Sequence, residues 1–225
     1  IAYLLAILIS WTIAHDMSAR TEPSKKQNIK RISLIIGCNK GNQDRTELKY
    51  AVSDARNISK VMEEMGGIQP EDNLLLGDPN RQLLFQTFDR LKARVDLLQK
   101  DHKVEVIIYY SGHSDGKGLL LGEEKIFYKE LKKIIGKLNA DVRIAILDSC
   151  SSGAFTRLKG GKKKKAFLID DAYNMHGYAV MTSSSSDEAS QESENLRGSF
   201  FTHNLVAGLR GAADMSGDKR VTLSE

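Results

Sequence analysis

Cysteine, proline and tryptophan are scarce in this chain. Its 225 residues include two cysteines, three prolines and one tryptophan. Cys38 and Cys150 are too few for a disulfide framework or a cysteine-based zinc cluster. A strong excess of charge is also missing, because the net charge is only +4 and much of it comes from the run KGGKKKKAF at residues 159–167. Without a basic stripe interleaved with aromatic residues we expect no nucleic acid partner, and we interpret the run as a solvated loop.

A long hydrophobic run is lacking too. The most apolar segment, IAYLLAILISWTIA, covers only residues 1–14, whereas a transmembrane helix needs about 20 residues. We interpret residues 1–29 as a signal peptide, or as an uncleaved N-terminal anchor, followed by a polar linker. A buried structural helix is the alternative. The protein is then expected to be exported, either periplasmic or secreted, or to be held at a membrane through this segment alone.

From Arg31 onward, short apolar runs alternate with amphipathic helical patterns. Apolar residues recur every three or four positions in residues 46–67, 83–100 and 127–138, which predicts helices. Residues 199–211 predict a last helix, with Ser199 at its start and Gly211 at its end. The runs between them, such as VEVIIYY and VRIAILD, are apolar throughout. This pattern is typical of a parallel sheet that helices cover on both faces.

A histidine and a cysteine each follow the end of an apolar run. His113 lies in YYSGHSDG and Cys150 lies in ILDSCSSGAF. Catalytic groups collect at the carboxyl ends of parallel strands, and the ends of neighbouring strands are about 5 Å apart. A thiolate can attack a carbonyl carbon while an imidazole serves as base and acid. Gly112 and Gly153 would allow a substrate to approach closely. A buried cysteine and a polar loop histidine are the alternatives for each residue taken singly.

These two motifs resemble those of the caspase-like cysteine peptidases, especially metacaspases and bacterial caspase-like proteins. LKYAVSDARNI and RGSFFTHNLVAGLRGAAD are similar to further motifs of that family, so the resemblance extends from about Arg31 to Glu225. It implies a three-layer α/β/α caspase-like fold with a mostly parallel central sheet of about six strands. Residues 30–225 would form the peptidase domain. Its parts would be a large-subunit-like segment (30–158), a basic linker (159–166) and a small-subunit-like segment (167–225).

The resemblance also implies catalytic roles and a cysteine endopeptidase activity. Cys150 would be the nucleophile, His113 the base and acid, and the backbone amides of Ser114 and Cys150 would form the oxyanion hole. The family usually has glycine where this sequence has Ser114. The expected partners are protein or peptide substrates.

Three further residues match the pocket in which metacaspases bind Arg or Lys before the scissile bond. They are Asp54, Ser111 and Asp148. A recessed pair of carboxylates would bind a guanidinium group in bidentate fashion and repel aspartate. The alternatives are a helix N-cap for Asp54 and a turn residue for Asp148. Glu192 falls near the position where caspases carry a substrate-binding arginine.

Two other functions fit the same motifs. The chain could be a catalytically silent caspase-like module that binds protein partners, or Cys150 could be a redox-sensing thiol. If the chain is an active peptidase specific for basic residues, self-cleavage after one of the lysines from Lys162 to Lys165 is expected, and an uncut solvated loop is the alternative.

The C-terminal segment DMSGDKRVTLSE has the outline of a calcium-binding loop. Asp214, Ser216, Asp218 and Glu225 occupy its first, third, fifth and twelfth positions. The sixth position, usually glycine, is Lys219. These residues are a Ca²⁺ candidate, and no other metal or cofactor is expected.

Overall fold

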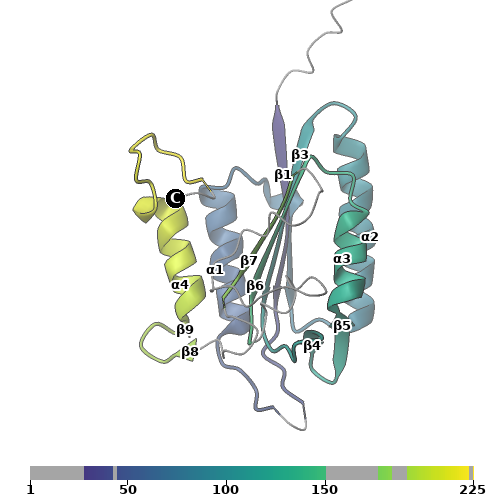
Figure 1. The fold of residues 1–225 in the computed structure, drawn as a ribbon, viewed down its shortest axis with the longest axis vertical. Coiled ribbons are helices and arrows are strands. Elements are labelled where there is room, and N and C mark those ends of the chain that lie inside the picture. The colour runs from purple at the N-terminus through teal and green to yellow at the C-terminus, as the bar shows by residue number, and fades with distance from the viewer. Residues whose placement is uncertain (1–27, 43–44, 151–176, 184–191, 223–224) are drawn as a thin grey trace, which may run out of the picture.

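A parallel β-sheet runs through the centre of the molecule (Figure 1). The computed structural model describes residues 28–42, 45–150, 177–183, 192–222 and residue 225. Within these residues the sheet has five strands in the order β2-β1-β3-β6-β7, and all neighbouring pairs are parallel. The strands are β1 (Ile29–Gly37), β2 (Asn73–Gly77), β3 (Lys103–Ser111), β6 (Val142–Asp148) and β7 (Tyr178–Thr182). The sequence predicted about six strands, and five is the number for the described part of the chain.

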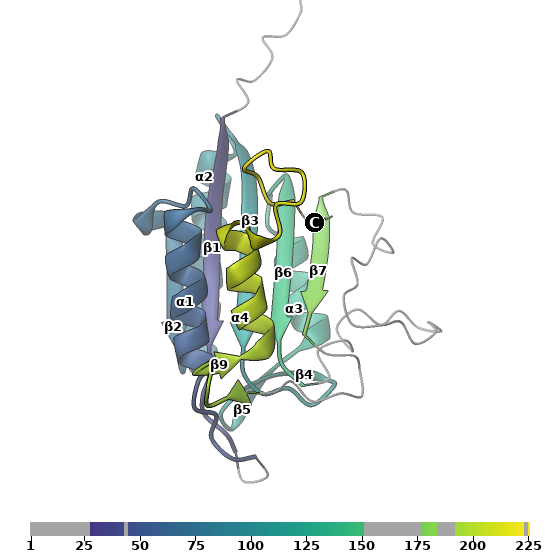
Figure 2. The same cartoon turned by 90° about the vertical axis from the view of Figure 1, so that its left-hand side faces the viewer.

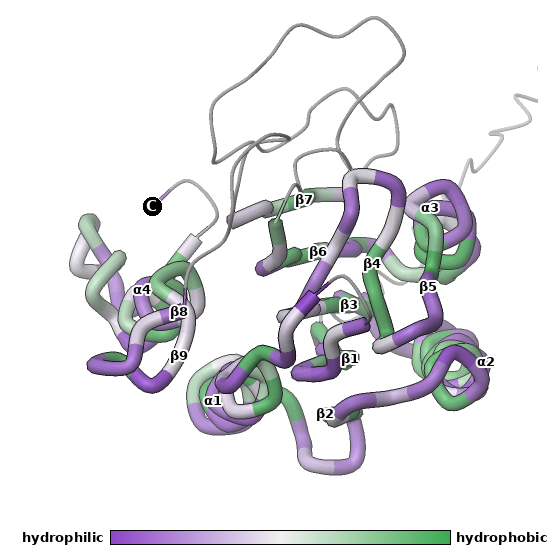
Figure 3. The backbone as a smooth tube through the Cα atoms, turned by 90° about the horizontal axis from the view of Figure 1, so that it is seen from below, coloured by the Kyte–Doolittle hydropathy of each residue, from purple (hydrophilic) through white to green (hydrophobic). Residues whose placement is uncertain are grey.

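Four α-helices cover the two faces of this sheet. Helices α1 (Ala51–Glu64) and α4 (Phe200–Ala207) lie over one face, onto which Figure 2 looks. Helices α2 (Arg81–Leu98) and α3 (Tyr128–Gly136) lie over the other face, as the view along the strands shows (Figure 3). The predicted three-layer α/β/α arrangement is therefore confirmed.

The alternation of side chains along β3 explains why its sequence is apolar throughout. Val106, Ile108 and Tyr110 belong to the core beneath α2 and α3. Ile107 and Tyr109 belong to the core beneath α1 and α4. Because successive side chains of a strand point to opposite faces, a strand between two helical layers needs apolar residues at both sets of positions.

Short elements complete the description. They are the 3₁₀-helix η1 (Pro70–Asp72), the antiparallel hairpin of β4 (Gly118–Leu121) with β5 (Glu124–Phe127), the antiparallel pair β8 (Glu192–Ser193) and β9 (Gly198–Ser199), and the π-helix η3 (Gly208–Ala212). Both small sheets lie at the edge where the arrowheads of the central strands point (Figure 2). No helix among the described residues is long and apolar enough to cross a membrane. The predicted signal peptide or anchor falls almost entirely in residues 1–27, outside the described residues.

Polar side chains cap the starts of two helices, and only one of these caps, Ser199, was predicted from the sequence. The Ser199 hydroxyl accepts a hydrogen bond from the Thr202 backbone N–H (2.9 Å), which confirms Ser199 as the N-cap of α4. Asn80 caps α2 by accepting from the Leu83 N–H (2.8 Å). Gly211 has a φ of 108° inside η3, where the helical conformation breaks down. Such caps satisfy backbone donors that have no partner within the helix.

Candidate active site

His113 and Cys150 lie at equivalent places on two neighbouring strands. β3 and β6 pair in parallel, and the last pair of their register is Ser111 with Asp148. His113 and Cys150 each follow one member of that pair by two residues. The Gly112 N–H also donates to the Asp148 carbonyl oxygen (3.1 Å), which connects the two strand ends directly. β3 and β6 are therefore neighbours, which is the condition under which His113 and Cys150 can act together.

A backbone carbonyl fixes the tautomer of His113. Nε2 of this nearly buried ring lies 2.8 Å from the carbonyl oxygen of Thr46. A carbonyl can only accept a hydrogen bond, so Nε2 carries the hydrogen. In the neutral ring Nδ1 is then the basic nitrogen, the one able to take a proton from a thiol. Thr46 was not predicted as a site residue, because a backbone carbonyl leaves no signature in the sequence.

The bridge that Ser114 forms with a neighbouring strand does not use its own amide. Ser114 forms an isolated antiparallel bridge with Leu119. The two hydrogen bonds of this bridge run from the Leu120 N–H to the His113 carbonyl (2.9 Å) and from the Asp115 N–H to the Gly118 carbonyl (3.3 Å). The bridge therefore uses the amides of neighbouring residues. The oxyanion role of the Ser114 amide stays a prediction.

Gly112 lies too close to its neighbours for any side chain. A Cβ atom placed on it would lie 2.4 Å from the Tyr110 hydroxyl oxygen and 3.1 Å from the Cys38 carbonyl oxygen. The Tyr110 hydroxyl in turn lies 2.8 Å from the His113 carbonyl oxygen. Glycine at position 112 therefore leaves room for the buried Tyr110 hydroxyl to contact the loop that carries His113. Gly153, the other glycine singled out from the sequence, lies outside the described residues.

The three predicted pocket residues are buried. Asp54, Ser111 and Asp148 are 2%, 4% and 3% exposed. Asp54 lies in the first turn of α1, whose N-cap is Tyr50, so the N-cap alternative for Asp54 is wrong. Asp148 is the last residue of β6 rather than a turn residue.

Residues at the start of α4 bind both carboxylates. The Ser199 N–H donates to Asp54 Oδ2 (3.0 Å), and the Ser199 hydroxyl donates to Asp148 Oδ2. The Thr202 hydroxyl also donates to Asp148 Oδ2 (2.7 Å) and lies 2.5 Å from the Tyr109 hydroxyl. The two acidic groups are therefore joined through one short segment. The sequence identified Ser199 only as a helix cap, because its second role depends on contacts with residues far away in the chain.

Burial raises the pKa of Asp54 to about 7. The hydrogen bond from the Ser199 amide lowers that pKa, whereas the negative charges of Asp148 and Glu192 raise it. Removing a carboxylate from water disfavours its charged form, and nearby negative charges act in the same direction. Asp54 consequently changes its charge close to neutral pH.

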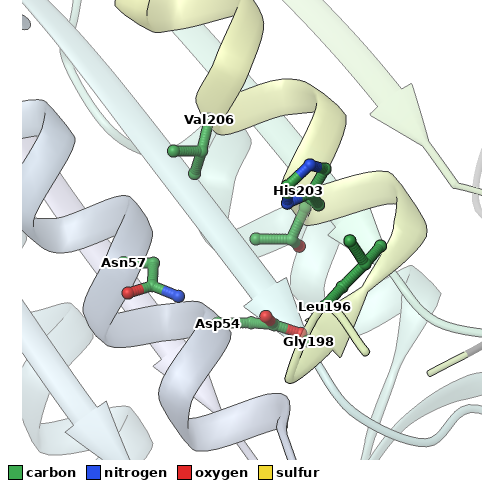
Figure 4. A pocket seen from close by; sticks show the side chains of 7 residues that line it. Asp54, Asn57, Leu196, Gly198, His203 and Val206 are labelled. Carbon is green, nitrogen blue, oxygen red and sulfur yellow. The ribbon is translucent and has the colours of Figure 1, made fainter. Parts of the chain in front are cut away.

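A small cleft of about 60 Å³ opens onto Asp54 between α1 and α4. Figure 4 shows the Asp54 carboxylate at its base, facing Gly198, with Asn57, His203 and Val206 farther along the two helices. The residues around it are Asp54, Asn57, Leu196, Gly198, Thr202, His203 and Val206. Ser111 and Asp148 are not in this lining, so of the three predicted pocket residues only Asp54 faces the cleft.

Glu192 and Glu194 attach the β8–β9 hairpin to the start of α1. The Glu192 carboxylate accepts hydrogen bonds from the backbone N–H groups of Lys49 (3.1 Å) and Tyr50 (2.9 Å). Glu194 accepts from the Lys49 ammonium and from the Tyr50 hydroxyl (2.6 Å). A carboxylate at the N-terminus of a helix is favoured by the unpaired amides and the helix dipole. The Glu192 carboxylate thus lies at the N-terminus of α1.

The calcium candidate folds as a loop around its first residue. Asp214 accepts hydrogen bonds from the backbone N–H groups of Gly217 (2.8 Å) and Lys219 (2.9 Å). Lys219 has a φ of 65°, the left-handed conformation that glycine usually supplies at this position. Among the described residues, no group of three or more His, Cys, Asp or Glu side chains could hold a metal ion. Calcium binding through Asp214, Ser216, Asp218 and Glu225 stays a prediction.

Comparison with known proteins identifies the family. The caspase-domain model of the peptidase family C14 matches residues 30–222. The chain therefore belongs to the caspase family of cysteine peptidases.

Two curated metacaspases are similar to this chain in alignments that are 199 positions long and cover 76% of it. It is 28% identical to Metacaspase-1 of Botryotinia fuckeliana and 27% identical to Metacaspase-1 of Sclerotinia sclerotiorum. The matches cover 47% and 45% of those proteins, so the chain spans about half the length of these relatives.

A solved structure, caspase-1 from Spodoptera frugiperda, superimposes with a TM-score of 0.59. The match covers 85% of this chain and 73% of that protein at 13% sequence identity. At this identity the likeness shows the fold alone, and it agrees with the caspase-like architecture predicted from the sequence.

Proposed function

We propose that this protein is a cysteine endopeptidase that cleaves after Arg or Lys, with Cys150 as nucleophile and His113 as base and acid. The observation that carries the proposal is the register of β3 and β6. It brings the residues two positions beyond Ser111 and Asp148 to the same edge of the sheet. A thiol and an imidazole at such a place can form the dyad that peptide hydrolysis requires.

The chemistry follows from the atoms that these residues present. Nδ1 of His113 takes the proton of the Cys150 thiol, and the thiolate attacks the carbonyl carbon of the scissile bond. The negative charge that develops on the carbonyl oxygen is stabilised by the Ser114 and Cys150 amides. The imidazolium then gives its proton to the leaving amine, and water hydrolyses the acyl-enzyme.

The preference for Arg or Lys is supported by charge. Asp54 faces the cleft between α1 and α4, and the Asp148 carboxylate is joined to it through Ser199. A cationic side chain near these groups gains charge-assisted hydrogen bonds, whereas an aspartate would be repelled.

Peptide reporters test the activity and the specificity together. Reporters that differ only in having Arg, Lys or Asp before the scissile bond are incubated with the wild type, with Cys150→Ala and with His113→Ala. Cys38→Ala is the matched control, since Cys38 is fully buried and burial raises the pKa of its thiol to about 11. We expect the wild type and the Cys38 variant to cleave after Arg and Lys and the other two variants to lose that activity.

Each other result points to a different conclusion. No cleavage of any reporter, with or without added Ca²⁺, would favour the silent module that binds protein partners. Cleavage after Asp alone would overturn the specificity and leave the peptidase standing. We also propose export through the N-terminal segment, which cell fractionation followed by N-terminal sequencing of the mature protein would test.

A further inference from the structure

The side chain of Ser114 connects the histidine loop to the nucleophile. Ser114 directly follows His113 and is 1% exposed. Its hydroxyl donates a hydrogen bond to the backbone carbonyl oxygen of Cys150. A side chain adjacent to the proposed base thus holds the backbone of the proposed nucleophile.

A buried tyrosine encloses this contact from the side of α3. Tyr128, the first residue of α3, is 6% exposed. Burial raises the pKa of its hydroxyl to about 12, and the neighbouring Ser114 side chain opposes that rise. Negative charge on Asp115, and on Cys150 when it is a thiolate, also raises this pKa. Buried hydrogen bonds of this kind are strong because water does not compete for their partners.

The direction of the Cys150 carbonyl matters for the thiol. The carbonyl carbon and Cβ are both bonded to the Cα atom of Cys150, and the strand β6 that precedes this residue is fixed in the sheet. A hydrogen bond that holds the carbonyl oxygen in place therefore restricts both the φ and the ψ angle of Cys150. Restricting φ limits the directions that the Cα–Cβ bond, and with it the sulfur, can take relative to the sheet. Small displacements of a reacting group are known to reduce enzymatic rates strongly.

From these contacts we infer that Ser114 is a positioning residue, whose hydroxyl orients Cys150 toward the imidazole of His113. This inference rests on the proposed function. It is separate from the proposed oxyanion role of the Ser114 backbone amide. Every substitution except proline retains that amide. The family resembled in the sequence usually has glycine at this position, and glycine offers the amide without the hydroxyl.

Removing the hydroxyl tests the inference. Ser114→Ala and Ser114→Gly are compared with the wild type and with Ser33→Ala. Ser33 is the matched control, because it is fully buried and its hydroxyl donates to Asn73 Oδ1 (2.6 Å) within the sheet. Two measurements are made: kcat and KM on the Arg reporter, and the rate at which iodoacetamide alkylates Cys150 between pH 5.5 and 9. Mass spectrometry of the two cysteine-containing peptides separates Cys150 from Cys38.

We expect kcat to fall by roughly tenfold in both Ser114 variants while KM stays within about twofold, since substrate binding is not affected. The alkylation profile of Cys150 should shift to higher pH, because the thiolate is less well paired with the imidazole. Ser33→Ala should keep both wild-type values.

Two outcomes would overturn the inference. One is a Ser114→Ala variant whose kcat and alkylation profile match those of Ser33→Ala. The other is alkylation of Cys38 as fast as Cys150 in the Ser114 variants, which would mean that the hydroxyl only supports the fold. If the wild type cleaves no reporter, the proposed function fails, while the alkylation profiles still decide whether Ser114 acts on Cys150.

Discussion

Burial brings the pKa of the Asp54 carboxyl group close to physiological pH. Its pKa is raised from an ordinary value of 3.8 to about 7, mainly by removal from water. If Asp54 receives the cationic side chain of a substrate, it does so only when ionised. We expect the KM for the Arg reporter to fall as the pH rises from 6 to 8 in the wild type. In Asp54→Asn the KM should be higher and nearly constant over this range.

The comparison uses KM because kcat also depends on the chemical step, whereas the cationic side chain is bound by Asp54 before that step. Steady-state kinetics on both proteins at half-unit pH steps makes the measurement. A wild-type KM that does not change with pH, or that changes equally in Asp54→Asn, would contradict a role for Asp54 in binding the cation.

The same pKa predicts how stability depends on pH, independently of any activity. A group whose folded-state pKa is raised binds its proton more tightly in the folded protein, so its contribution to stability is greatest at low pH. Between pH 4 and 7 the free energy of unfolding of the wild type should decrease relative to that of Asp54→Asn. The relative decrease should be a few kcal/mol, at most about 4, and should level off above pH 7. Urea titrations at several pH values measure it, and a constant difference between the two proteins would contradict the shifted pKa.

At the scale of elements, the start of α4 has two tasks. Ser199 caps the helix, and it also binds the Asp148 and Asp54 carboxylates. Asn80 caps α2 at an exposed position through a single bond to the Leu83 amide. We expect Asn80→Ala to lower the free energy of unfolding by about 1 kcal/mol. Ser199→Ala should lower it by roughly 2–4 kcal/mol, because it also removes a donor from a buried carboxylate. Denaturant unfolding of both variants checks this order, and equal losses would show that the carboxylate contact adds nothing.

The β8–β9 hairpin approaches α1 so closely that it requires a glycine. A Cβ atom on Gly198 would lie 2.5 Å from Asp54 Oδ1. Gly198→Ala should push the hairpin away from the carboxylate, lower the free energy of unfolding by about 1–3 kcal/mol and weaken cleavage after Arg. Gly208→Ala is the control, because its Cβ would lie 3.4 Å from the Ala213 side chain within a helical segment. Thermal unfolding and reporter assays compare the two variants. Equal behaviour would show that the close approach has no importance.

Individual elements show how far the sequence alone could go. β3 and β6 were predictable, because a strand between two helical layers needs apolar residues on both sides. The placement of His113 and Cys150 followed from the parallel arrangement. The hydrogen bond from Ser199 to Asp148 was not predictable, since the two residues are 51 positions apart and only the packing of α4 on the sheet brings them together. The Thr46 carbonyl could not be identified either, because every residue carries the same backbone carbonyl whatever its side chain.

At the scale of the whole molecule, contacts cross between the two predicted halves of the domain. β7 pairs with β6 inside the central sheet, while Glu192 and Ser199 bind residues at the start of α1. The predicted basic linker, residues 159–166, and the self-cleavage lysines lie outside the described residues. Cleavage there would break one peptide bond and leave these contacts in place.

We therefore expect a cut chain to stay associated. The lysines from Lys162 to Lys165 are replaced in the Cys150→Ala variant by the recognition sequence of a specific protease, and the purified protein is cleaved. Light scattering should give the same mass before and after the cut in native buffer, and two species smaller than the 25.0 kDa chain in denaturant. Separation of the pieces in native buffer would contradict the prediction.

The pairing of Ser111 with Asp148 also determines where the chain can accept changes of length. Each strand residue advances the chain by about 3.3 Å and turns its side chain to the opposite face. Adding or deleting a single residue between Ser111 and His113, or between Asp148 and Cys150, would therefore carry one reactive group away from the other. Whole peptides inserted in surface connections far from these two steps would leave the spacing intact. We therefore expect proteins with this fold to vary in length elsewhere, but not between Ser111 and His113 or between Asp148 and Cys150.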